Sequence, residues 1–392
     1  MRIGFDISQT GRGKAGCGYV AASFIQHLAE IDHHNDYLLF PTFGDFFWDP
    51  NWQQSTVQPQ SPNFRRALGH NSRDEACRFW RQPDAEFESA FGDLDIIHSN
   101  NYFCPRGLKQ AKLVYTLYDL SFLEQPDWTT EANRLGCFTG VFQASLYAHL
   151  IVSISEHTRQ HFLATFPHFP ADRIEVIHLA SRYHDPSLAP QPPALAALAR
   201  QGFWLSVGTI EPRKNHLQLL NAYARLKAQG RPRLPLVLAG GEGWLMQDFA
   251  GEIAIRGLQS DVLVTGYVDD LELKWLYQNC FALVYPSLWE GFGLPLVEAM
   301  SQAAPVITSN GSSLREIAGS AAILVDPLDD AQLAAAMTRL LEDAAYRRFL
   351  CDQSLNRAKD FSWAASARKL LDCYQRLVPA TRRMTLAYAG HS

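Results

Sequence analysis

Two glutamates in the second half of the sequence have a residue type and a spacing that could serve a binding site. Glu290 and Glu298 are eight positions apart, one in a glycine-bearing loop and one on the first turns of a predicted helix. Proline is tolerated in the first turn of a helix, so we expect this helix to begin at Pro295 and to direct its N-terminal N–H groups at an anion. Carboxylates beside a phosphate site favour a ligand with hydroxyls on both sides of its phosphates, as in a nucleotide sugar. A βαβ unit with two solvated glutamates is the alternative.

Arg213 and Lys214 are the second chemical feature, and they follow Gly208 at the end of a predicted strand, residues 203–207. An arginine supplies a planar fork of donors and a lysine supplies a mobile point charge, which together suit a diphosphate. Cations at the N-terminus of the next helix are repelled by the positive end of its dipole. They destabilise the helix unless an anion binds beside them and compensates their charge. We therefore expect the pair to bind a diphosphate, and a solvated helix N-terminus is the alternative.

The elements that position these residues are apolar strands alternating with helices. Four prolines between His184 and Leu195 interrupt the apolar periodicity and mark the expected domain boundary. Past it we predict strands at 203–207, 234–239, 261–265, 281–285, 306–308 and 322–325, with three final helices at 330–343, 345–360 and 362–378. This alternation indicates a parallel sheet covered on both faces.

The first half repeats the pattern and begins with a strand at 2–7. A loop containing Gly11, Gly13, Gly16 and Gly18 leads into a predicted helix at 19–31, a layout that suits a phosphate or sugar site or a flexible connection. Further strands are predicted at 36–40, 94–98, 112–117, 151–155 and 174–177, with helices at 130–149 and 156–166. Residues 43–92 have no predicted element. The D-x-D motif at 93–95 is predicted to be a turn, with a metal site as the alternative.

The predicted fold class is α/β, with two open sheets facing each other across a cleft. The predicted domains are residues 1–185 and 196–361, followed by a C-terminal helix and tail, 362–392. Ligands bind such sheets at the carboxyl ends of the strands. The glycine loop near the start of the chain, the Arg213-Lys214 pair and the loop before Glu298 all follow strands in this way.

Composition excludes several classes of function. The formal net charge of −5 argues against bulk binding to nucleic acid. Seven scattered cysteines without a C-x-x-C pair indicate reduced thiols in a cytoplasmic protein. We expect no signal peptide, because the chain starts directly with a strand, and no apolar run approaches the ~20 residues that span a bilayer.

Residues 64–81 combine arginines with aromatic residues. Five arginines stand here among Phe64, Phe79 and Trp80. Such a segment can rest on an anionic membrane surface that carries a lipid-linked acceptor. A solvated loop is the alternative, so membrane contact at the inner face is expected to be peripheral at most.

In their order along the chain, these motifs resemble the retaining glycosyltransferases of the GT-B fold, family 4 in particular. The resemblance covers most of the chain and rests on Gly16-x-Gly18, residues 118–123, 153–156, 208–215 and 290–298. It implies two Rossmann-like domains, with the helix at 362–378 crossing back onto the first. It also implies a nucleotide-sugar donor, a glycan or lipid-linked acceptor, no metal and no other cofactor.

The resemblance implies roles for individual residues. Arg213 and Lys214 would hold the donor diphosphate, Glu298 would bind the ribose hydroxyls, and Glu290 would hold the transferred sugar. The remaining donor-side positions are Gly18, Gly208, Val268 beside the nucleobase, and the backbone of Phe292, Gly293 and Leu294. The sequence Val-Gly-Thr-x-Glu-Pro-Arg-Lys-Asn at 207–215 is similar to bacterial mannosyltransferases of surface-polysaccharide assembly, so GDP-mannose is the first donor, with UDP- and dTDP-sugars open.

The acceptor side departs from the family pattern at Tyr118. Family members often have histidine before Asp-Leu-Ser, and a phenol with a pKa near 10 cannot replace it as a neutral-pH base. Asp119 is then the residue expected to orient or deprotonate the acceptor, Gly16 lies on the same side, and His98 could take the place of the missing base. Alternative functions are a non-catalytic nucleotide-sugar-binding subunit, an epimerase or a phosphorylase.

Overall fold

The computed structural model describes most of the 392 residues and divides the chain into two compact units. The described residues are 1–8, 10–11, 16–40, 57–66, 88, 91–100, 104–185, 187–198, 202–230, 234–246 and 248–378. The first unit combines Met1–Tyr118, Leu135–Leu179 and Trp363–Ser392, and the second combines Asp119–Arg134 and Ala180–Ser362. The short segment 119–134 and residues 180–185, which were expected in the first domain, therefore group with the second unit.

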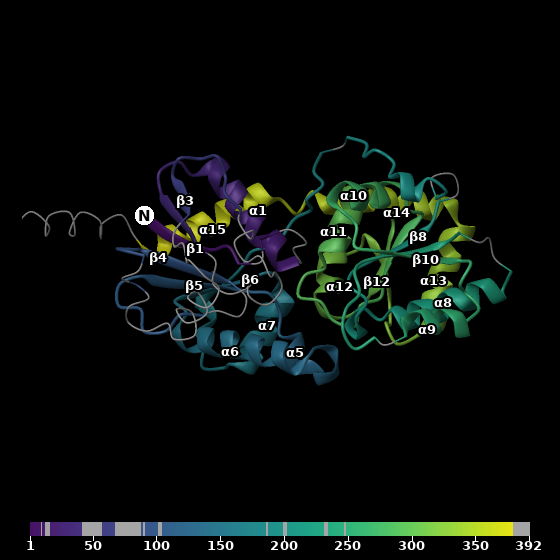
Figure 1. The fold of residues 1–392 in the computed structure, drawn as a ribbon, viewed down its shortest axis with the longest axis horizontal. Helices are drawn as coiled ribbons and strands as arrows, with labels where there is room; N and C mark the ends of the chain where they lie inside the picture. Colours follow the sequence, from purple (N-terminus) through teal and green to yellow (C-terminus); the bar gives the residue numbers. More distant parts are fainter. Residues whose placement is uncertain are drawn as a thin grey trace, which may run out of the picture. The chain divides into compact units, whose positions relative to one another are not determined.

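The first unit is built on a parallel sheet with the strand order β3-β2-β1-β4-β5-β6-β7 among the described residues (Figure 1). Most of its strand residues are buried, because helices cover both faces of a parallel sheet. The strands are β1 Arg2–Asp6, β2 Asp36–Phe40, β3 Phe64–Arg66, β4 Ile96–Asn100, β5 Lys112–Leu117, β6 Leu150–Ser153 and β7 Ile174–Val176.

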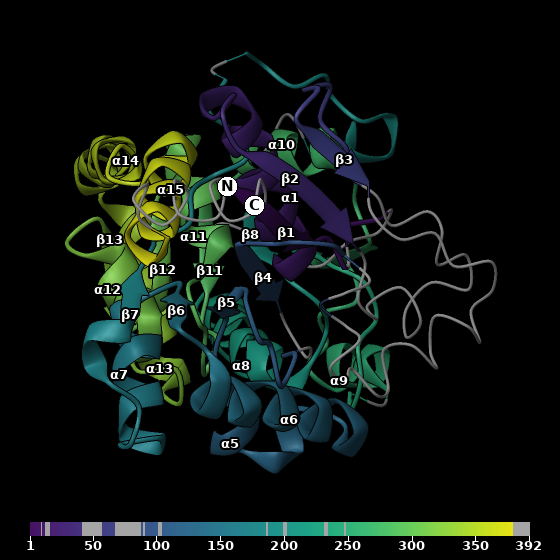
Figure 2. The ribbon, with the colours of Figure 1, turned by 90° about the vertical axis from the view of Figure 1, so that its left-hand side faces the viewer.

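Helices from distant parts of the sequence cover this sheet. In Figure 1, α1 and α15 lie above the strands, and α6 and α7 lie below them; Figure 2 shows the same elements from the side. The bounds are α1 Gly16–Ile31, α6 Glu131–Tyr147, α7 Glu156–Thr165 and α15 Trp363–Leu377, with a 3₁₀ turn η3 at Ala171–Arg173. The final helix α15 packs on α1, and the ring of Trp363 meets that of Phe24 edge-on at 5.4 Å.

The second unit has its own parallel sheet, with the order β10-β9-β8-β11-β12-β13. Its strands are β8 Trp204–Val207, β9 Leu236–Ala239, β10 Val262–Gly266, β11 Ala282–Tyr285, β12 Val306–Ser309 and β13 Ala322–Val325. The central strands β8, β9, β11 and β12 are completely buried. This burial explains their continuous apolar sequence, which made them predictable.

The helices of the second unit pack on both faces of this sheet. In Figure 1, α8, α9 and α13 lie on one side, and α10, α11 and α14 lie on the other. The bounds are α5 Ser121–Glu124, η2 Pro126–Trp128, η4 Pro193–Leu195, η5 Pro212–Lys214, α8 His216–Ala228, α9 Phe249–Ile255, α10 Asp270–Asn279, α11 Leu294–Ser301, α12 Ser312–Ala318, α13 Asp330–Glu342 and α14 Ala344–Ala358. In the described part of the chain, no helix is long and apolar enough to cross a membrane.

Some local predictions for the first unit differ from the structure. Helix α1 begins at Gly16 rather than residue 19, so Gly16 and Gly18 lie in its first turn and not in the loop. Strand β4 lies two residues later than predicted, because Asp95 is used before it: the carboxylate of Asp95 accepts the backbone N–H of Arg2 at 2.8 Å. Strand β3 occupies part of the region that had no predicted element. The D-x-D motif thus lies just before β4 and is hydrogen-bonded to the first residue of β1.

Candidate active site

The predicted donor residues of the second unit lie at the point where its strand order reverses. Strands β8 and β11 are adjacent and parallel, and the chain leaves them for opposite sides of the sheet. Such a switch point leaves an open crevice at the carboxyl ends of the two strands, where ligands bind. The loop after β8 carries Arg213 and Lys214, and the loop after β11 carries Glu290.

Main-chain contacts join these two loops. The carbonyl of Arg213 accepts the N–H of Leu288 at 2.8 Å and the hydroxyl of Ser287 at 3.0 Å. Asn215 has a left-handed backbone conformation, with φ 61°, and its amide donates to the carbonyl of Pro286 at 3.0 Å. Asparagine tolerates this conformation better than most residues, which explains the sharp passage from η5 into α8.

Glu290 is the centre of the charged cluster. Its Oε1 accepts hydrogen bonds from Lys214 Nζ at 2.6 Å, from the Tyr285 hydroxyl at 2.8 Å and from Ser287 Oγ at 2.6 Å. Its Oε2 lies 3.0 Å from Arg213 Nη1. The two predicted cations and one predicted carboxylate therefore meet directly, although Glu290 lies 76 positions after Lys214 and 77 after Arg213 in sequence.

The electrostatics of this cluster follow from burial and pairing. Burial by itself would raise the pKa of Glu290, but Arg213 and Lys214 outweigh it and lower the pKa to about 2. Burial would likewise lower the pKa of Arg213, but the carboxylates of Glu290 and Glu211 raise it above its ordinary value; Asp119 contributes in the same direction. Glu290 and Arg213 are therefore both charged at neutral pH, and the carboxylate of Glu290 compensates the cations that oppose the dipole of α8.

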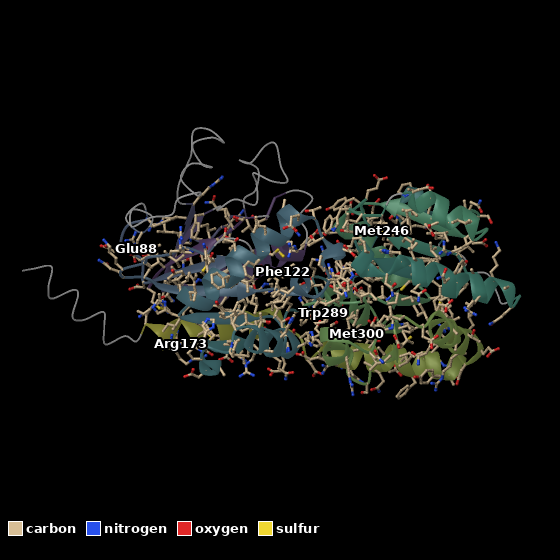
Figure 3. The ribbon with its side chains drawn as sticks, turned by 90° about the horizontal axis from the view of Figure 1, so that it is seen from below. Glu88, Phe122, Arg173, Met246, Trp289 and Met300 are labelled. Carbon is tan, nitrogen blue, oxygen red and sulfur yellow. The ribbon has the colours of Figure 1, made fainter. Side chains whose placement is uncertain are left out.

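Helix α11 begins next to this cluster, at Leu294 rather than at Pro295, and its N-cap is Gly293. The φ of Gly293 is +98°, and a Cβ there would lie 2.7 Å from a methyl group of Leu314, so only glycine fits. Phe292 is buried and its ring meets Phe361 edge-on at 5.7 Å, which leaves only its backbone for a ligand. Figure 3 labels Trp289 and Met300, which bracket this segment of the second unit.

Glycines bring a third loop against the first. A Cβ on Gly240, directly after β9, would lie 2.0 Å from the carbonyl oxygen of Gly208. Gly208 itself has φ +143°, and a Cβ there would lie 3.2 Å from Cε of Lys214. The backbone at Gly240 thus packs directly on the backbone at Gly208, and Gly208 in turn contacts the aliphatic part of the Lys214 side chain. These contacts position that side chain.

Glu298 belongs to a different group of contacts. It is buried in α11, and its two oxygens accept hydrogen bonds from Arg182 Nε at 2.7 Å and from the Tyr277 hydroxyl at 3.0 Å. Val268, the expected neighbour of the nucleobase, lies half-buried in the loop between β10 and α10, the helix that carries Tyr277.

The residues expected on the acceptor side are divided between the units. Gly16 and Tyr118 belong to the first unit, where the Tyr118 hydroxyl donates to the carbonyl of Cys17 at 3.3 Å; Gly18, predicted on the donor side, belongs to the first unit as well. Asp119 groups with the second unit, and its Oδ1 accepts the N–H and hydroxyl of Ser121 at the start of α5.

The assignment of His98 to the acceptor side requires correction. Its side chain is fully buried in the core of the first unit, with Nδ1 bonded to the Tyr374 hydroxyl and Nε2 to Thr116 Oγ1 at 2.7 Å. Burial lowers the pKa of His98 to about 3. The ring is therefore a neutral structural residue that connects β4 and β5 to α15, and it does not replace a catalytic base.

Several residues of these two clusters were not predicted. Glu211, Tyr285 and Ser287 stand within five positions of predicted residues, so the local sequence could have indicated them. Arg182 and Tyr277 contact Glu298 from other segments of the chain, and Asp270 contacts Arg182; nothing in the local sequence marks these three residues.

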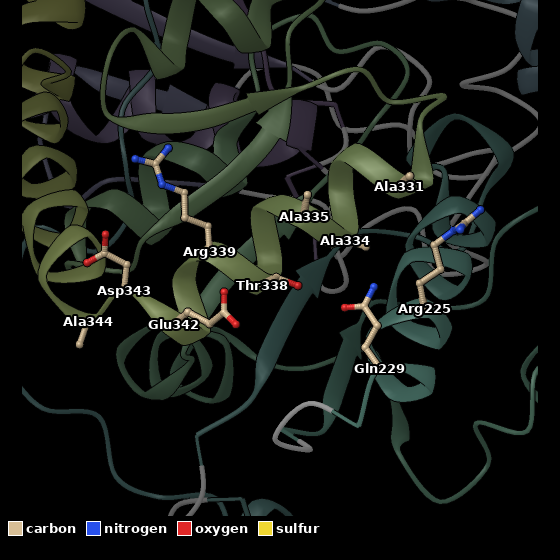
Figure 4. A pocket seen from close by; sticks show the side chains of 10 residues that line it. All are labelled: Arg225, Gln229, Ala331, Ala334, Ala335, Thr338, Arg339, Glu342, Asp343 and Ala344. Atoms are coloured by element: carbon tan, nitrogen blue, oxygen red, sulfur yellow. The ribbon is translucent and has the colours of Figure 1, made fainter.

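A surface groove of about 640 Å³ lies elsewhere on the second unit, between α8 and α13 (Figure 4). Its two arginines already have partners: Arg225 Nε lies 2.6 Å from Asp330, and the guanidinium of Arg339 stacks 3.6 Å above the Tyr346 ring. The groove shares no residue with either charged cluster, so it is not the donor site.

Comparison with known proteins agrees with this geometry. Residues 192–356 match the family model described as glycosyl transferases group 1. The chain is 36% identical over 287 residues to the O-antigen chain mannosyltransferase B of Escherichia coli, which covers 72% of this chain and 74% of that protein. It is 37% identical over 186 residues to the serotype-specific mannosyltransferase WbdA of Escherichia coli, over 46% of this chain and 22% of that protein.

Solved structures show the fold. The sucrose-phosphate synthase of Thermosynechococcus elongatus superposes with a TM-score of 0.74 at 22% identity, covering 97% of this chain and all of that one. WaaG, a glycosyltransferase of lipopolysaccharide biosynthesis, gives a TM-score of 0.69 at 15% identity over 96% of this chain. These similarities confirm the predicted two-domain GT-B fold. Together with the extended match to the O-antigen enzyme, they show that the chain belongs to the glycosyl transferases group 1 family and is a glycosyltransferase.

Proposed function

We propose that the protein transfers mannose from GDP-mannose, with retention of anomeric configuration, to a glycan or lipid-linked acceptor in bacterial surface-polysaccharide assembly. The cluster of Arg213, Lys214 and Glu290 at the β8–β11 switch point carries this proposal. Relatives that are named mannosyltransferases support mannose as the sugar. UDP- and dTDP-sugars are the alternative donors.

Charge stabilisation of the leaving diphosphate is the main catalytic effect in this proposal. The acceptor oxygen bonds to the anomeric carbon on the face from which the nucleoside diphosphate departs. The bond between that carbon and the phosphate oxygen breaks, and the departing phosphate takes the acceptor proton. Arg213 and Lys214 carry two positive charges against Glu290 and Glu211, so the helix dipole of α11 must supply part of the stabilisation. The scheme requires no metal ion.

Lys214→Ala tests the assignment. Losing one charge contact to the leaving group should reduce kcat by about 10²-fold or more. Glu290 keeps Arg213, Tyr285 and Ser287 as partners, so the melting temperature should change little. The matched control is Lys227→Ala, which removes an ion pair to Asp261 at 2.8 Å in the same unit. Near-normal turnover in a stably folded Lys214→Ala protein would contradict the assignment.

A thermal-shift series with GDP-, UDP- and dTDP-sugars tests the donor. GDP-mannose should raise the melting temperature most, because a ligand that binds only the folded state stabilises it. A larger shift with a UDP- or dTDP-sugar would replace GDP-mannose in the proposal. Binding without transfer to any glycan acceptor would favour a non-catalytic subunit, and donor turnover without an acceptor would favour an epimerase.

We also propose that residues 64–81 contact an anionic membrane at the cytoplasmic face. Of this segment only Phe64–Arg66 lies in the described residues; Phe64 is buried against Tyr37 with a ring distance of 4.2 Å, while Arg65 and Arg66 are exposed. Flotation with liposomes of increasing anionic lipid content should recover increasing amounts of protein. Recovery that does not depend on anionic lipid would refute the contact.

A further inference from the structure

The carboxylate of Glu298 is held by two side chains from other segments of the second unit. Only 1% of Glu298 is exposed. Arg182 Nε donates to Oε1 at 2.7 Å, and the Tyr277 hydroxyl donates to Oε2 at 3.0 Å. Burying a carboxylate is costly unless it is paired and hydrogen-bonded, so these contacts determine where its charge lies and how its plane is oriented.

Arg182 uses its planar geometry to join two helices. While Nε contacts Glu298 on α11, Nη1 lies 2.8 Å from Oδ1 of Asp270, the first residue of α10. The side chain of Arg182 is 16% exposed. A lysine offers one point charge and cannot hold both carboxylates in this geometry.

The two residues that flank Arg182 also form hydrogen bonds with the last residue of α11 and the residue after it. Ser181 Oγ lies 2.8 Å from Ser301 Oγ, and Gln302 Nε2 donates to the carbonyl of Tyr183 at 2.9 Å. Arg182 stands three residues after Leu179, where the chain leaves the first unit. Contacts on both neighbours restrict its position, so its guanidinium is pre-organised toward Glu298.

Glu298 keeps the capacity to accept further hydrogen bonds. A carboxylate has about four acceptor positions, and Arg182 and Tyr277 use one on each oxygen. A vicinal diol, such as that of a ribose, presents two hydroxyl donors that match the two oxygens of one carboxylate.

We propose that Arg182 is a positioning residue for the donor nucleotide. By holding Glu298 from the segment where the chain enters the second unit, it makes the protein discriminate a ribonucleotide from a deoxyribonucleotide. This inference rests on the proposed function, in which Glu298 binds the ribose hydroxyls. Tyr277 assists by fixing the second oxygen.

The test compares the binding of GDP and 2′-deoxy-GDP to wild type, Arg182→Met and Arg182→Lys by calorimetry. Wild type should prefer GDP by about tenfold, the worth of one hydrogen bond to a charged group. Arg182→Met should reduce the preference to within about twofold, raise the donor KM and leave kcat nearly unchanged, because a ribose contact is made equally in the ground and transition states. Arg182→Lys should not restore the preference.

A double-variant cycle shows whether Arg182 acts through Glu298. Glu298→Gln should lose the same preference, and adding Arg182→Met should cause little further loss. The matched control is Arg225→Met, which breaks the 2.6 Å ion pair with Asp330 in the same unit and should leave the preference unchanged.

The outcomes separate this inference from the proposed function. Unchanged discrimination in Arg182→Met, or additive losses in the double variant, would overturn the role of Arg182 while leaving the proposed function intact. A lower melting temperature with wild-type discrimination would make Arg182 purely structural and also overturn it. Failure of wild type to bind any nucleoside diphosphate would overturn the proposed function, and this inference with it.

Discussion

Glu290 accepts hydrogen bonds from three side chains, and its second oxygen lies beside Arg213. The charge and orientation of this carboxylate therefore depend on its partners. The same is true of Glu298, which is held by Arg182 and Tyr277. At the residue scale the site consists of buried charges that compensate one another. Removing Glu290, the carboxylate that both cations share, leaves those buried cations without their common partner and should destabilise the fold.

Glu290→Gln should show this cost as a pH-dependent loss of stability. The pKa of Glu290 is lowered from 4.5 to about 2 in the folded protein, so its stabilisation is fully present above pH 4.5 and disappears as the pH falls toward 2. A shift of this size corresponds to about 3 kcal/mol. The difference in melting temperature between wild type and variant should therefore be greatest above pH 5 and shrink in acid.

The control for this experiment is Glu131→Gln, because the Glu131–Arg134 pair on α6 is exposed to solvent. Exposed pairs contribute little to stability, so that variant should follow wild type at every pH. A Glu290→Gln difference that stayed constant down to pH 2 would mean that the carboxylate charge does not stabilise the fold.

Variants of Tyr118 and Asp119 test the acceptor side. Burial raises the pKa of Tyr118 well above its ordinary value, so its phenol stays protonated and cannot act as a base near neutral pH. Tyr118→Phe should keep much of the acceptor kcat/KM, Tyr118→Ala should lose most of it, and Asp119→Asn should reduce it more than Tyr118→Phe does. If Asp119→Asn were silent and Tyr118→Phe inactive, the phenol would have to act as an acid or base.

At the scale of elements, the proposed donor site depends on loops that follow adjacent strands. Strands β8, β9 and β11 end side by side, and their loops approach closely enough that side chains at some positions would collide. The glycines after β8 and β9 are therefore part of the site, although they carry no functional group. The sequence predicted a donor-side role for Gly208 but not for Gly240, whose close approach to Gly208 is visible only in the structure.

Gly240→Ala and Gly241→Ala form a matched pair at this scale. A Cβ at Gly240 would lie 2.0 Å from the carbonyl oxygen of Gly208, whereas a Cβ at Gly241 meets nothing within 4 Å. Gly240→Ala should displace the loop that carries Arg213 and Lys214, lowering the melting temperature and weakening nucleotide binding severely. Gly241→Ala should resemble wild type in both measurements; equal effects of the two variants would contradict the close-approach explanation.

For the whole molecule, the chain completes its first unit with its last described helix. Helix α15 packs on α1, the buried Trp363 meets Phe24, and Tyr374 bonds His98 in the core. The first unit therefore acquires its full core only after the second unit has been traversed. Its stability should depend on residues more than 300 positions from its first helix.

Trp363→Ala should destabilise the first unit by about 3–5 kcal/mol, as expected for removing a large buried aromatic side chain. The control is Phe349→Ala on α14, because Phe349 is 51% exposed. Limited proteolysis should cleave Trp363→Ala within the first unit earlier than wild type or the control. Equal cleavage rates would show that α15 is not needed to hold the core of that unit together.

Much of this architecture follows from local patterns. Alternating apolar strands and helices predicted both sheets. Because the predicted strands end just before Arg213, Lys214 and Glu290, the sequence also predicted that these residues lie on the loops after β8 and β11. Apolar runs are predictive because a parallel strand must be buried on both faces. The errors in element bounds have local causes. Helix α1 starts earlier than predicted because its first turn includes two glycines, and β4 starts later because Asp95 is hydrogen-bonded to the first residue of β1.

The sequence by itself determined the fold class, the family resemblance and the loops that carry the donor residues, because these depend on periodicity and on residues close together in the chain. Only the tertiary structure decided which charges meet. It placed His98 in the core, paired Glu290 with both cations, and brought Arg182 to Glu298 across 116 positions. Hydrogen bonds act over about 3 Å, so partners this far apart in sequence are determined by how the strands and helices pack, and no local pattern records them.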